Sequence, residues 1–365
     1  MLCYVDDEIV PGITRKRSGR YWKYFDPDGN RITDRDEIDR LNAIGMPPAY
    51  ERCWFCPNPL GHLQATGYDA KGRKQYRYHP DFREQQETLK YERLAAFGRA
   101  LPKMRKRVMK DLKGKPTAYE TVVAAIVHLI DETQMRIGNE SYAKENKSFG
   151  ATTLRNRHAR VARGKVTIAY AGKHGVKREI TIEDPRLARI AAKTQELRGQ
   201  HLFEYVDENG EICPVTSSDV NDYIKEAMGE DFTAKDFRTW GASTIAFEEM
   251  AKRAKGSKRL HLKSIIEPVA EALGNTPAIS RKSYVHPALI EAAKDAGALG
   301  RRKLPRKTKY LSAAERGLIE FLDALPAEQE KTEAEAESRA EAKGESKAKA
   351  EAELAAEAGK DLEAA

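Results

Sequence analysis

The run from Thr121 to Met135 places the strictest limit on what this sequence can fold into. Its large apolar side chains recur at helical spacing, and they are Val122, Ile126, Leu129 and Ile130. A helix this apolar is stable only when other elements cover it, because the burial of apolar surface is what stabilises it. Since the pattern turns helical from about residue 84, the sequence predicts a mainly helical domain around this segment.

The part of the chain before that point predicts strands instead. The aromatic segment Tyr21–Phe25 leads into a strong turn signal at residues 26–30. A second hairpin spans residues 62–78, and between the two hairpins Thr33–Ile44 has the pattern of a short helix. This region is therefore expected to form a mainly β domain.

A small sheet is also expected inside the helical region. Val166–Tyr170 alternates in character, Gly172–Gly175 supplies a turn, and residues 176–182 form the return strand. Helices resume beyond it, including a long one at Asp236–Lys255 and another that Thr276 caps.

The predicted fold class is therefore α+β, with three parts. Residues 1–85 form the mainly β domain, and residues 86–320 form the mainly helical domain with its small sheet. Residues 321–365 are rich in Ala, Glu and Lys and have almost no large apolar side chains, so we expect an acidic, flexible tail.

The formal charge of +8 understates how basic the body of the chain is. Residues 327–365 contain twelve acidic and six basic side chains, a balance of −6, which leaves +14 on residues 1–326. A body with this charge is typical of a protein that binds a polyanion such as nucleic acid. On charge alone, a merely soluble basic protein is the alternative.

Several other classes of protein do not fit the sequence. No run of eighteen apolar residues predicts a membrane span, and no secretory signal is recognisable, so we expect a cytoplasmic location. The four cysteines do not make a disulfide framework. Cys53 and Cys56 have the spacing of zinc ligands, but no second pair follows at zinc-finger spacing. We expect them to be strand residues and expect no bound metal.

The sequence has no phosphate-binding loop, no dinucleotide-binding motif and no clustered carboxylates of a metal-dependent nuclease. An enzyme that acts on nucleic acid without a metal must neutralise the transferring phosphate with side chains. Arginine suits that task, because its planar fork matches phosphate oxygens. The reaction also needs a nucleophile and an acid for the leaving oxygen.

Four motifs occur in an order that matches these needs. They are Thr133–Asn139, Tyr170–Lys173, Lys235–Trp240 and Gly274–Tyr284. Together they resemble the type IB DNA topoisomerases, in their small bacterial and poxvirus-like form. Upstream, residues 61–80 look like the DNA-clamping β domain of that family, so the resemblance covers roughly residues 10–300.

The resemblance implies five catalytic residues, Arg136, Lys173, Arg238, Asn275 and Tyr284. Tyr284 would attack a backbone phosphorus and hold the 3′ phosphate covalently, while the two arginines stabilise the transition state. Lys173 would protonate the 5′ leaving oxygen. The phosphotyrosyl bond conserves the energy of the cleaved ester, so neither ATP nor a metal cofactor is expected.

Asn275 stands where many members of the family carry histidine. An amide can donate a hydrogen bond to a phosphate oxygen but brings no charge, so a positioning role is expected. For the acid, Lys165 and Lys177 are rival lysines, and an ordinary hairpin-tip lysine is the alternative reading of Lys173.

The resemblance also implies contacts to DNA outside the catalytic set. The residues expected to make them are Tyr76, Tyr78, Tyr142 and Lys235, although each tyrosine could equally be a plain strand or core residue. The expected partner is duplex DNA, held in a C-shaped clamp by a monomeric protein that associates with the nucleoid.

Two other functions stay open at this stage. A tyrosine recombinase shares the same arginine, lysine and tyrosine chemistry on a related fold, but the N-terminal β domain and the Lys235–Trp240 motif speak against it. The second alternative is a non-catalytic DNA-binding relative. The presence of nearly all the expected polar residues argues against it.

Overall fold

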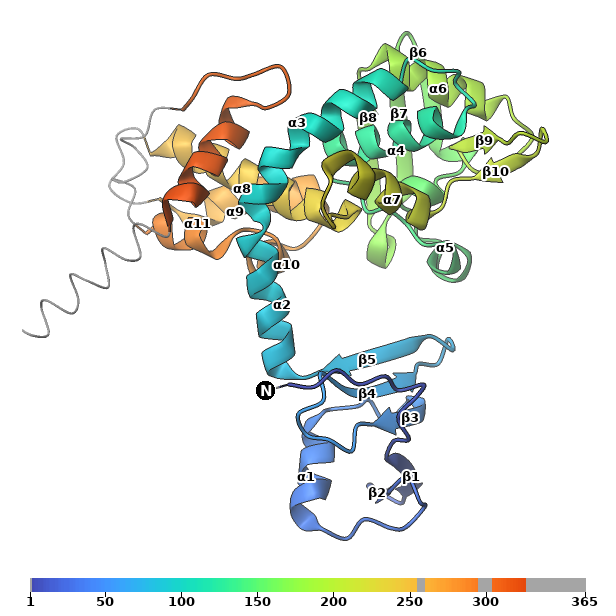
Figure 1. Ribbon diagram of the computed structural model, residues 1–365, viewed down its shortest axis with the longest axis vertical. Coiled ribbons are helices and arrows are strands. Elements are labelled where there is room, and N and C mark those ends of the chain that lie inside the picture. Colours follow the sequence, from blue (N-terminus) through green and yellow to red (C-terminus); the bar gives the residue numbers. More distant parts are fainter. Residues whose placement is uncertain (1, 255–259, 295–303, 326–365) are drawn as a thin grey trace, which may run out of the picture. The chain divides into compact units, whose positions relative to one another are not determined.

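The computed structural model describes residues 2–254, 260–294 and 304–325, and it combines helices with small antiparallel sheets (Figure 1). The predicted α+β class is therefore confirmed. The chain divides into two compact units, Met1–Glu92 and Arg93–Ala365. Among the described residues, no helix is both long enough and apolar enough to cross a membrane.

The first unit contains two small sheets and two helices. Strands β1 (Thr14–Ser18) and β2 (Tyr21–Phe25) form an antiparallel pair, and β3 (Glu51–Phe55), β4 (Leu63–Tyr68) and β5 (Lys74–Tyr78) form an antiparallel meander. The helices are α1 (Arg35–Ala43) and α2 (Pro80–Glu92). The hairpin predicted at residues 62–78 and the short helix at Thr33–Ile44 are confirmed. The strand at Tyr21–Phe25 and the turn at residues 26–30 are also present, but that strand pairs with β1 before it, so the first hairpin turns at residues 19–20 instead.

The core of this unit is small and gathers around β2, β3 and β4. Its buried side chains are Ile13, Tyr24, Leu41, Met46, Cys53, Phe55 and Ala65. Cys53 and Cys56 are buried as free thiols at the end of β3. Within the described ranges, no group of three or more His, Cys, Asp or Glu side chains could hold a metal ion.

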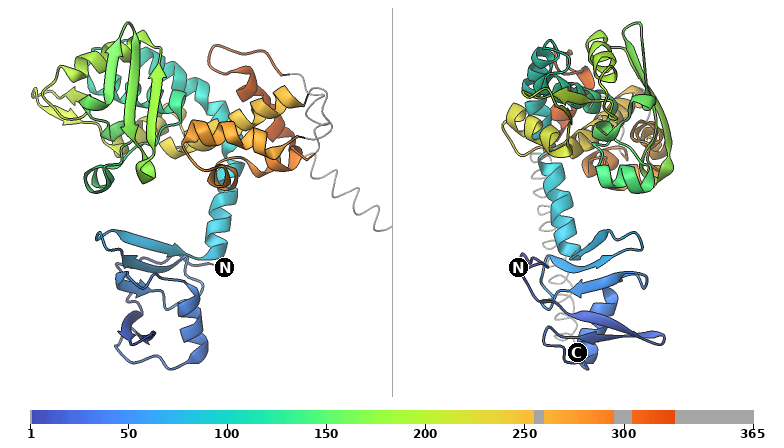
Figure 2. Two further views of the ribbon diagram at one scale, coloured as in Figure 1. Left: turned by 180° about the vertical axis from the view of Figure 1, so that it is seen from behind. Right: turned by 90° about the vertical axis from the view of Figure 1, so that its right-hand side faces the viewer.

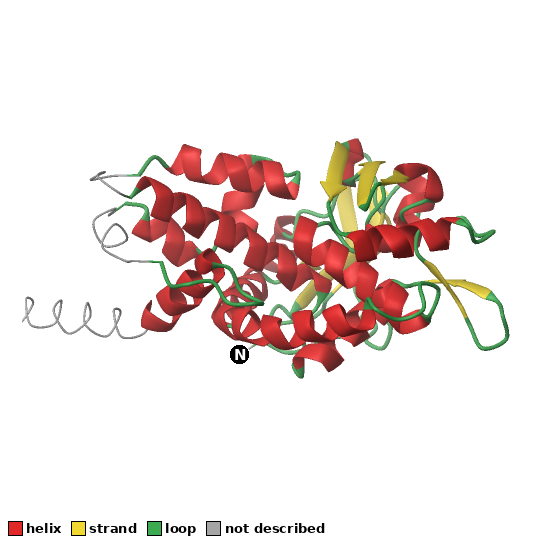
Figure 3. Ribbon diagram, turned by 90° about the horizontal axis from the view of Figure 1, so that it is seen from above, coloured by secondary structure: helices red, strands yellow, loops and turns green. Residues whose placement is uncertain are grey.

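The second unit is mainly helical (Figure 3). Its helices are α3 (Leu94–Asp111), α4 (Tyr119–Thr133), α5 (Glu140–Asn146), α6 (Pro185–Gln195), α7 (Ser217–Met228), α8 (Ala234–Arg253), α9 (Leu262–Leu273), α10 (Pro277–Ser283) and α11 (Pro287–Ala292). A further helix spans residues 313–325, which we call helix 313–325.

Helix α4, the apolar run of the sequence, lies at the centre of this unit. Ten of its consecutive residues, from Thr121 to Ile130, are buried. It contacts α3, α6, α7, α8 and β9, so apolar side chains on every side of it meet other elements. Because α4 is packed on all sides, its C-terminal end has a fixed position, and so does the start of the loop that follows it.

The sheet of the second unit is an antiparallel meander of β6 (Ala159–Ala162), β7 (Lys165–Ala171) and β8 (Lys177–Ile182), drawn in green in Figure 2. The predicted hairpin is confirmed: Tyr170 pairs with Arg178 at its far end, and a turn at residues 172–176 closes it. A separate hairpin joins β9 (Glu204–Val206) and β10 (Ile212–Pro214).

The predicted tail begins at residue 321, but residues 321–325 belong to helix 313–325, where Phe321 and Leu322 are buried. The remaining part, residues 326–365, lies outside the described residues. The assignment of DNA clamping to residues 1–85 stays a prediction.

Candidate active site

Arg136 lies in the loop that follows α4. Gln134 ends the helix in a left-handed conformation, with φ of 51°. The loop is then fixed from the other side, because the Ala151 amide donates to the Arg136 carbonyl at 2.9 Å. Gly150 permits this approach: a Cβ there would lie 2.5 Å from the same carbonyl oxygen. The backbone of Arg136 is thus held by packing at both ends.

Arg238 reaches the same place from α8 and is only 4% exposed. Its Nη1 donates to the Gln134 carbonyl, and its Nη2 donates to the Leu273 carbonyl at 3.2 Å. These are the carbonyls left unpaired where α4 and α9 end, and a cation is favourable at such ends. Arg238 therefore links the two helix ends and is itself fixed by them.

Asn275 follows the end of α9, which Gly274 closes in a left-handed conformation at φ of 59°. Arg136 Nη2 donates to Asn275 Oδ1 at 2.8 Å. Because the amide oxygen is engaged in this way, the amide NH₂ of Asn275 is left as its available donor.

Tyr284 lies at the end of α10, the short helix that Thr276 caps and Pro277 begins, as predicted. Its backbone carbonyl accepts a hydrogen bond from Ser243 Oγ on α8 at 3.3 Å. The guanidinium carbon of Arg238 lies 5.1 Å from the centre of the Tyr284 ring. Tyr284 is thus half-buried next to the arginine pair.

Two tyrosines near these arginines differ in electrostatic environment. Burial raises the pKa of Tyr284, but the positive charges of Arg238 and Arg136 outweigh burial and hold its pKa below the ordinary value. Tyr170 of β7 is more deeply buried, and there burial raises the pKa above the ordinary value despite the nearby arginines. Tyr284 is therefore the phenol that loses its proton more easily.

Two buried nitrogen atoms of the site have no partner among the described residues. They are Arg238 Nε and Asn275 Nδ2. A buried donor without a partner is costly, so such atoms point to a group that binds there. Both are N–H donors beside a tyrosine, which suits the oxygens of a phosphate.

Lys173 occupies the tip of the β7–β8 hairpin and lines one cleft together with Arg136 and Arg238. Its side chain is exposed and forms no ion pair with any described residue. Of the rival lysines, Lys165 is paired with Glu183 at the other end of the hairpin. Lys177 is exposed and does not line the cleft.

The four residues predicted to contact DNA are all exposed but lie outside this cluster. Tyr76 and Tyr78 are stacked on one face of β5, with ring centres 6.1 Å apart and an angle of 11° between the planes. Tyr142 lies on α5 with 43% of its surface exposed, and Lys235 lies in the first turn of α8.

Sequence reasoning missed three residues that build the site. Gln134 contributes the carbonyl for Arg238, and Ser243 holds the backbone of Tyr284. Arg178 donates from β8 to the carbonyls of Glu271 and Ala272, both at 2.7 Å, and so fastens the lysine hairpin to the end of α9. Gln134 lies within a quoted motif, but nothing in the sequence pattern singles out Ser243 or Arg178.

The fold and the site define a class of protein: an α+β protein in which two arginines and an amide surround a tyrosine and can bind a phosphate. Comparison with known proteins narrows this class. Residues 79–310 match the family described as "Eukaryotic DNA topoisomerase I, catalytic core", and residues 21–69 match "Bacterial DNA topoisomerase IB, N-terminal domain". The chain belongs to the type IB DNA topoisomerase family.

Two of the chain's relatives are viral DNA topoisomerases. The chain is 33% identical to DNA topoisomerase 1B of Acanthamoeba polyphaga mimivirus over 295 residues, which cover 78% of this chain and 88% of the relative. It is 26% identical to DNA topoisomerase 1B of Vaccinia virus (strain Copenhagen), over 67% of this chain and 76% of the relative. A solved structure of the XerH site-specific recombinase bound to its difH substrate is 19% identical with a TM-score of 0.34, over 53% of this chain and 52% of that one.

Proposed function

We propose that this protein relaxes supercoiled duplex DNA by cutting and rejoining one strand, with Tyr284 as the nucleophile. The observation that carries the proposal is the pair of unpartnered donors, Arg238 Nε and Asn275 Nδ2, beside a phenol whose pKa is lowered. Donors of this kind next to an easily ionised phenol support a site that binds and stabilises the oxygens of an attacked phosphate.

In the proposed reaction, the phenolate oxygen of Tyr284 forms a bond to phosphorus while the bond from phosphorus to the 5′ oxygen breaks. Arg136 and Arg238 stabilise the additional negative charge on the five-coordinate phosphorus. The strand then remains joined through a 3′-phosphotyrosyl ester. Attack by the 5′ hydroxyl reverses the same steps and restores Tyr284, so sealing needs no external energy source.

Lys173 is proposed as the acid that gives a proton to the departing 5′ oxygen. Its place at the cleft beside both arginines supports this role, and its lack of an ion pair with any described residue leaves its ammonium able to reach the leaving group.

The substrate is proposed to be duplex DNA without sequence-specific pairing of sites, bound by a monomer in the cytoplasm. The charge of +14 on residues 1–326 supports attraction to phosphates, and binding should weaken steeply with salt. Tyr76 and Tyr78 are proposed to contact the DNA from the first unit, and Tyr142 and Lys235 from the second.

Relaxation of a supercoiled plasmid, with EDTA present and ATP absent, tests the proposal. The wild type is expected to relax the plasmid and Tyr284→Phe to lose this activity, because phenylalanine has no nucleophilic oxygen. Tyr170→Phe serves as the matched control on the neighbouring phenol and should relax DNA. Equal relaxation by Tyr284→Phe and wild type would refute the assignment of the nucleophile.

The role of Lys173 needs a separate test with a modified leaving group. A DNA substrate with sulphur in place of the bridging 5′ oxygen releases a thiolate, whose conjugate acid has a pKa of about 8.5 and which needs no acid to depart. Lys173→Ala should be slow on ordinary DNA and close to wild type on the sulphur substrate. Lys177→Ala should be normal on both. Failure of the sulphur substrate to restore Lys173→Ala would exclude the proton-donor role.

A further inference from the structure

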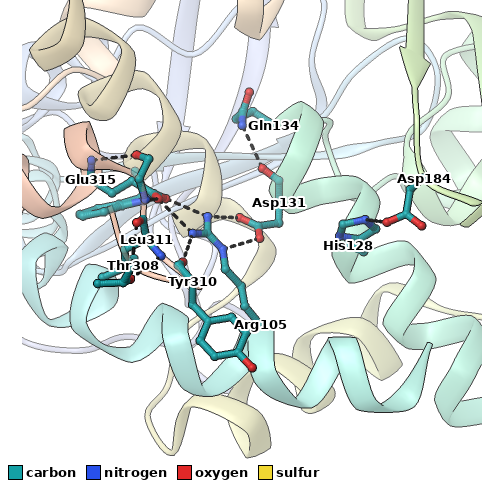
Figure 4. Close-up of polar contacts among 11 residues, drawn as sticks. Arg105, His128, Asp131, Gln134, Asp184, Thr308, Tyr310, Leu311 and Glu315 are labelled. Carbon is teal, nitrogen blue, oxygen red and sulfur yellow. Dashed lines mark hydrogen bonds and ion pairs between the residues drawn. The ribbon is translucent and has the colours of Figure 1, made fainter. Parts of the chain in front are cut away.

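A buried ion network lies behind the candidate site and joins three elements of the second unit (Figure 4). Arg105 of α3 is at its centre. Its Nε and Nη2 donate to the two oxygens of Asp131 on α4, both at 2.8 Å. Its Nη2 also donates to Glu315 Oε1 on helix 313–325 at 2.8 Å, and its Nη1 donates to Glu315 Oε2 at 3.0 Å.

The three side chains of this network are largely buried, and their charges are paired. Asp131 and Glu315 are 7% and 9% exposed, and Arg105 is 20% exposed. Burial raises the pKa of Glu315, but Arg105 outweighs burial and holds that pKa below its ordinary value, so the carboxylate stays charged. Charges this deep are tolerated only when paired in good geometry, and removing one partner leaves the others uncompensated.

The first connection to the site runs through the end of α4. The Asp131 carbonyl accepts a hydrogen bond from Gln134 Nε2 at 3.0 Å, as Figure 4 shows. The Gln134 carbonyl in turn accepts from Arg238, and Arg136 follows two residues later. The position of Asp131 thus bears on both site arginines.

The second connection runs through α8. Trp240 lies two residues after Arg238 and donates from Nε1 to Glu315 Oε1 at 3.1 Å. Its ring is packed so closely that a Cβ on Gly98 of α3 would lie 2.2 Å from Trp240 Cη2. Helix α8 is therefore fixed on two faces. On one face, Arg238 is bonded to the ends of α4 and α9, and on the other, Trp240 is bonded to Glu315.

We infer that Glu315 and Arg105 are positioning residues for the strand-transfer reaction. Helix 313–325, which follows the nucleophile in the sequence, fixes α4 against α8 through this network and so sets the spacing between Arg136 and Arg238. The inference rests on the proposed function, since it concerns the arginines of that same site. Neither residue touches the DNA; both act through the elements that carry the arginines.

Single-turnover cleavage at saturating DNA tests the inference. Glu315→Gln keeps the size of the side chain and removes its charge. We expect the cleavage rate constant to fall at least tenfold, with the amplitude of cleavage and the Kd for DNA within threefold of wild type. Religation should slow by the same factor, because both directions pass through one phosphorane, so the cleavage equilibrium stays unchanged.

The chain offers a matched control on the same two helices. Asp323 of helix 313–325 pairs with Arg99 of α3 at 2.5 Å, but both side chains are about half exposed. Asp323→Asn should leave the rate constant unchanged. Arg105→Lys, which retains the charge but not the two-sided fork, is a second variant and should also slow cleavage. If Glu315→Gln does not fold, Arg105→Lys becomes the variant that decides the outcome. All assays are run at temperatures below the thermal unfolding midpoint of the variant used.

The results separate positioning from simple loss of fold. A normal rate constant with a reduced amplitude in the deciding variant would overturn the inference, because it means fewer folded molecules rather than misplaced arginines. Equal slowing by Asp323→Asn would also overturn it. If the wild type itself does not cleave DNA, the proposed function fails instead, and this outcome is distinguishable from the others.

Discussion

At the scale of single residues, two phenols lie near the same pair of arginines and differ in whether burial outweighs the positive charge. Arg136 and Arg238 lower the pKa of Tyr284 below its ordinary value, whereas burial keeps the pKa of Tyr170 above it. The motifs predicted Tyr284 as the nucleophile but could not predict this contrast, because the depth of each ring depends on how α10 and β7 pack.

The first prediction concerns the pH dependence of cleavage. Arg136→Gln removes a positive charge that lowers the pKa of Tyr284, so that pKa should rise. Since the phenolate is the attacking form, the acid limb of the profile of single-turnover rate against pH should move to higher pH. At pH values above that limb, the rate of the variant should still be lower than that of wild type. The reason is that Arg136 no longer stabilises the negative charge on the five-coordinate phosphorus. An acid limb at the wild-type pH would contradict the electrostatic coupling.

The second prediction concerns the amide donor of Asn275. Asn275→Asp keeps the shape but removes the NH₂ group that is buried without a partner. Loss of one such donor typically costs about 10²–10³ in rate, and the added negative charge works in the same direction. Asn275→His, which provides an N–H donor, should stay within about tenfold of wild type. Cleavage rates measured at saturating DNA check both, and similar rates for Asp and His would argue against a donor role.

At the scale of elements, helix ends rather than helix bodies build the site. Arg136 and Asn275 follow the ends of α4 and α9, and Arg238 donates to the carbonyls that these ends leave free. Helix ends carry unpaired carbonyls, so they fix arginines with little further structure. The hairpin that carries Lys173 is attached to the end of α9 through Arg178, which donates to two of the carbonyls there.

The third prediction follows from that attachment. Arg178→Met removes two hydrogen bonds to carbonyls of α9, so the unfolding free energy should fall by about 1–3 kcal/mol. The cleavage rate should also fall, by about tenfold, because the hairpin that carries Lys173 is less well placed. Arg160→Met on β6 is the control, since Arg160 is exposed on the same sheet. Urea unfolding and single-turnover cleavage check the pair, and equal effects of the two substitutions would count against the anchoring role.

At the scale of the whole molecule, charge is divided unevenly along the chain. Residues 1–326 carry +14 and residues 327–365 carry −6. Opposite charges on one chain reduce its attraction to a polyanion, and salt screens that effect.

The fourth prediction tests this division. Deleting residues 327–365 raises the formal charge from +8 to +14, so the Kd for duplex DNA should fall at low salt. The two proteins should converge as salt rises above a few hundred millimolar, because screening shortens the range of the charges. Fluorescence anisotropy over a salt series provides the measurement. Superimposable curves for the full and shortened chains would exclude an effect of the acidic residues on DNA binding.

The sequence by itself determined the α+β class, the central apolar helix, the β4–β5 hairpin of the first unit, the β7–β8 hairpin of the second unit and the family. These follow from local patterns: helical spacing at Thr121–Met135, alternation at Val166–Tyr170, and caps such as Thr276 before Pro277. The roles of the five predicted site residues and of the four DNA contacts remain proposals. Only the tertiary structure decided what holds the site together. Ser243, Arg178, Arg105 and Glu315 act through contacts between residues that are far apart in the chain, and local pattern carries no information about such contacts.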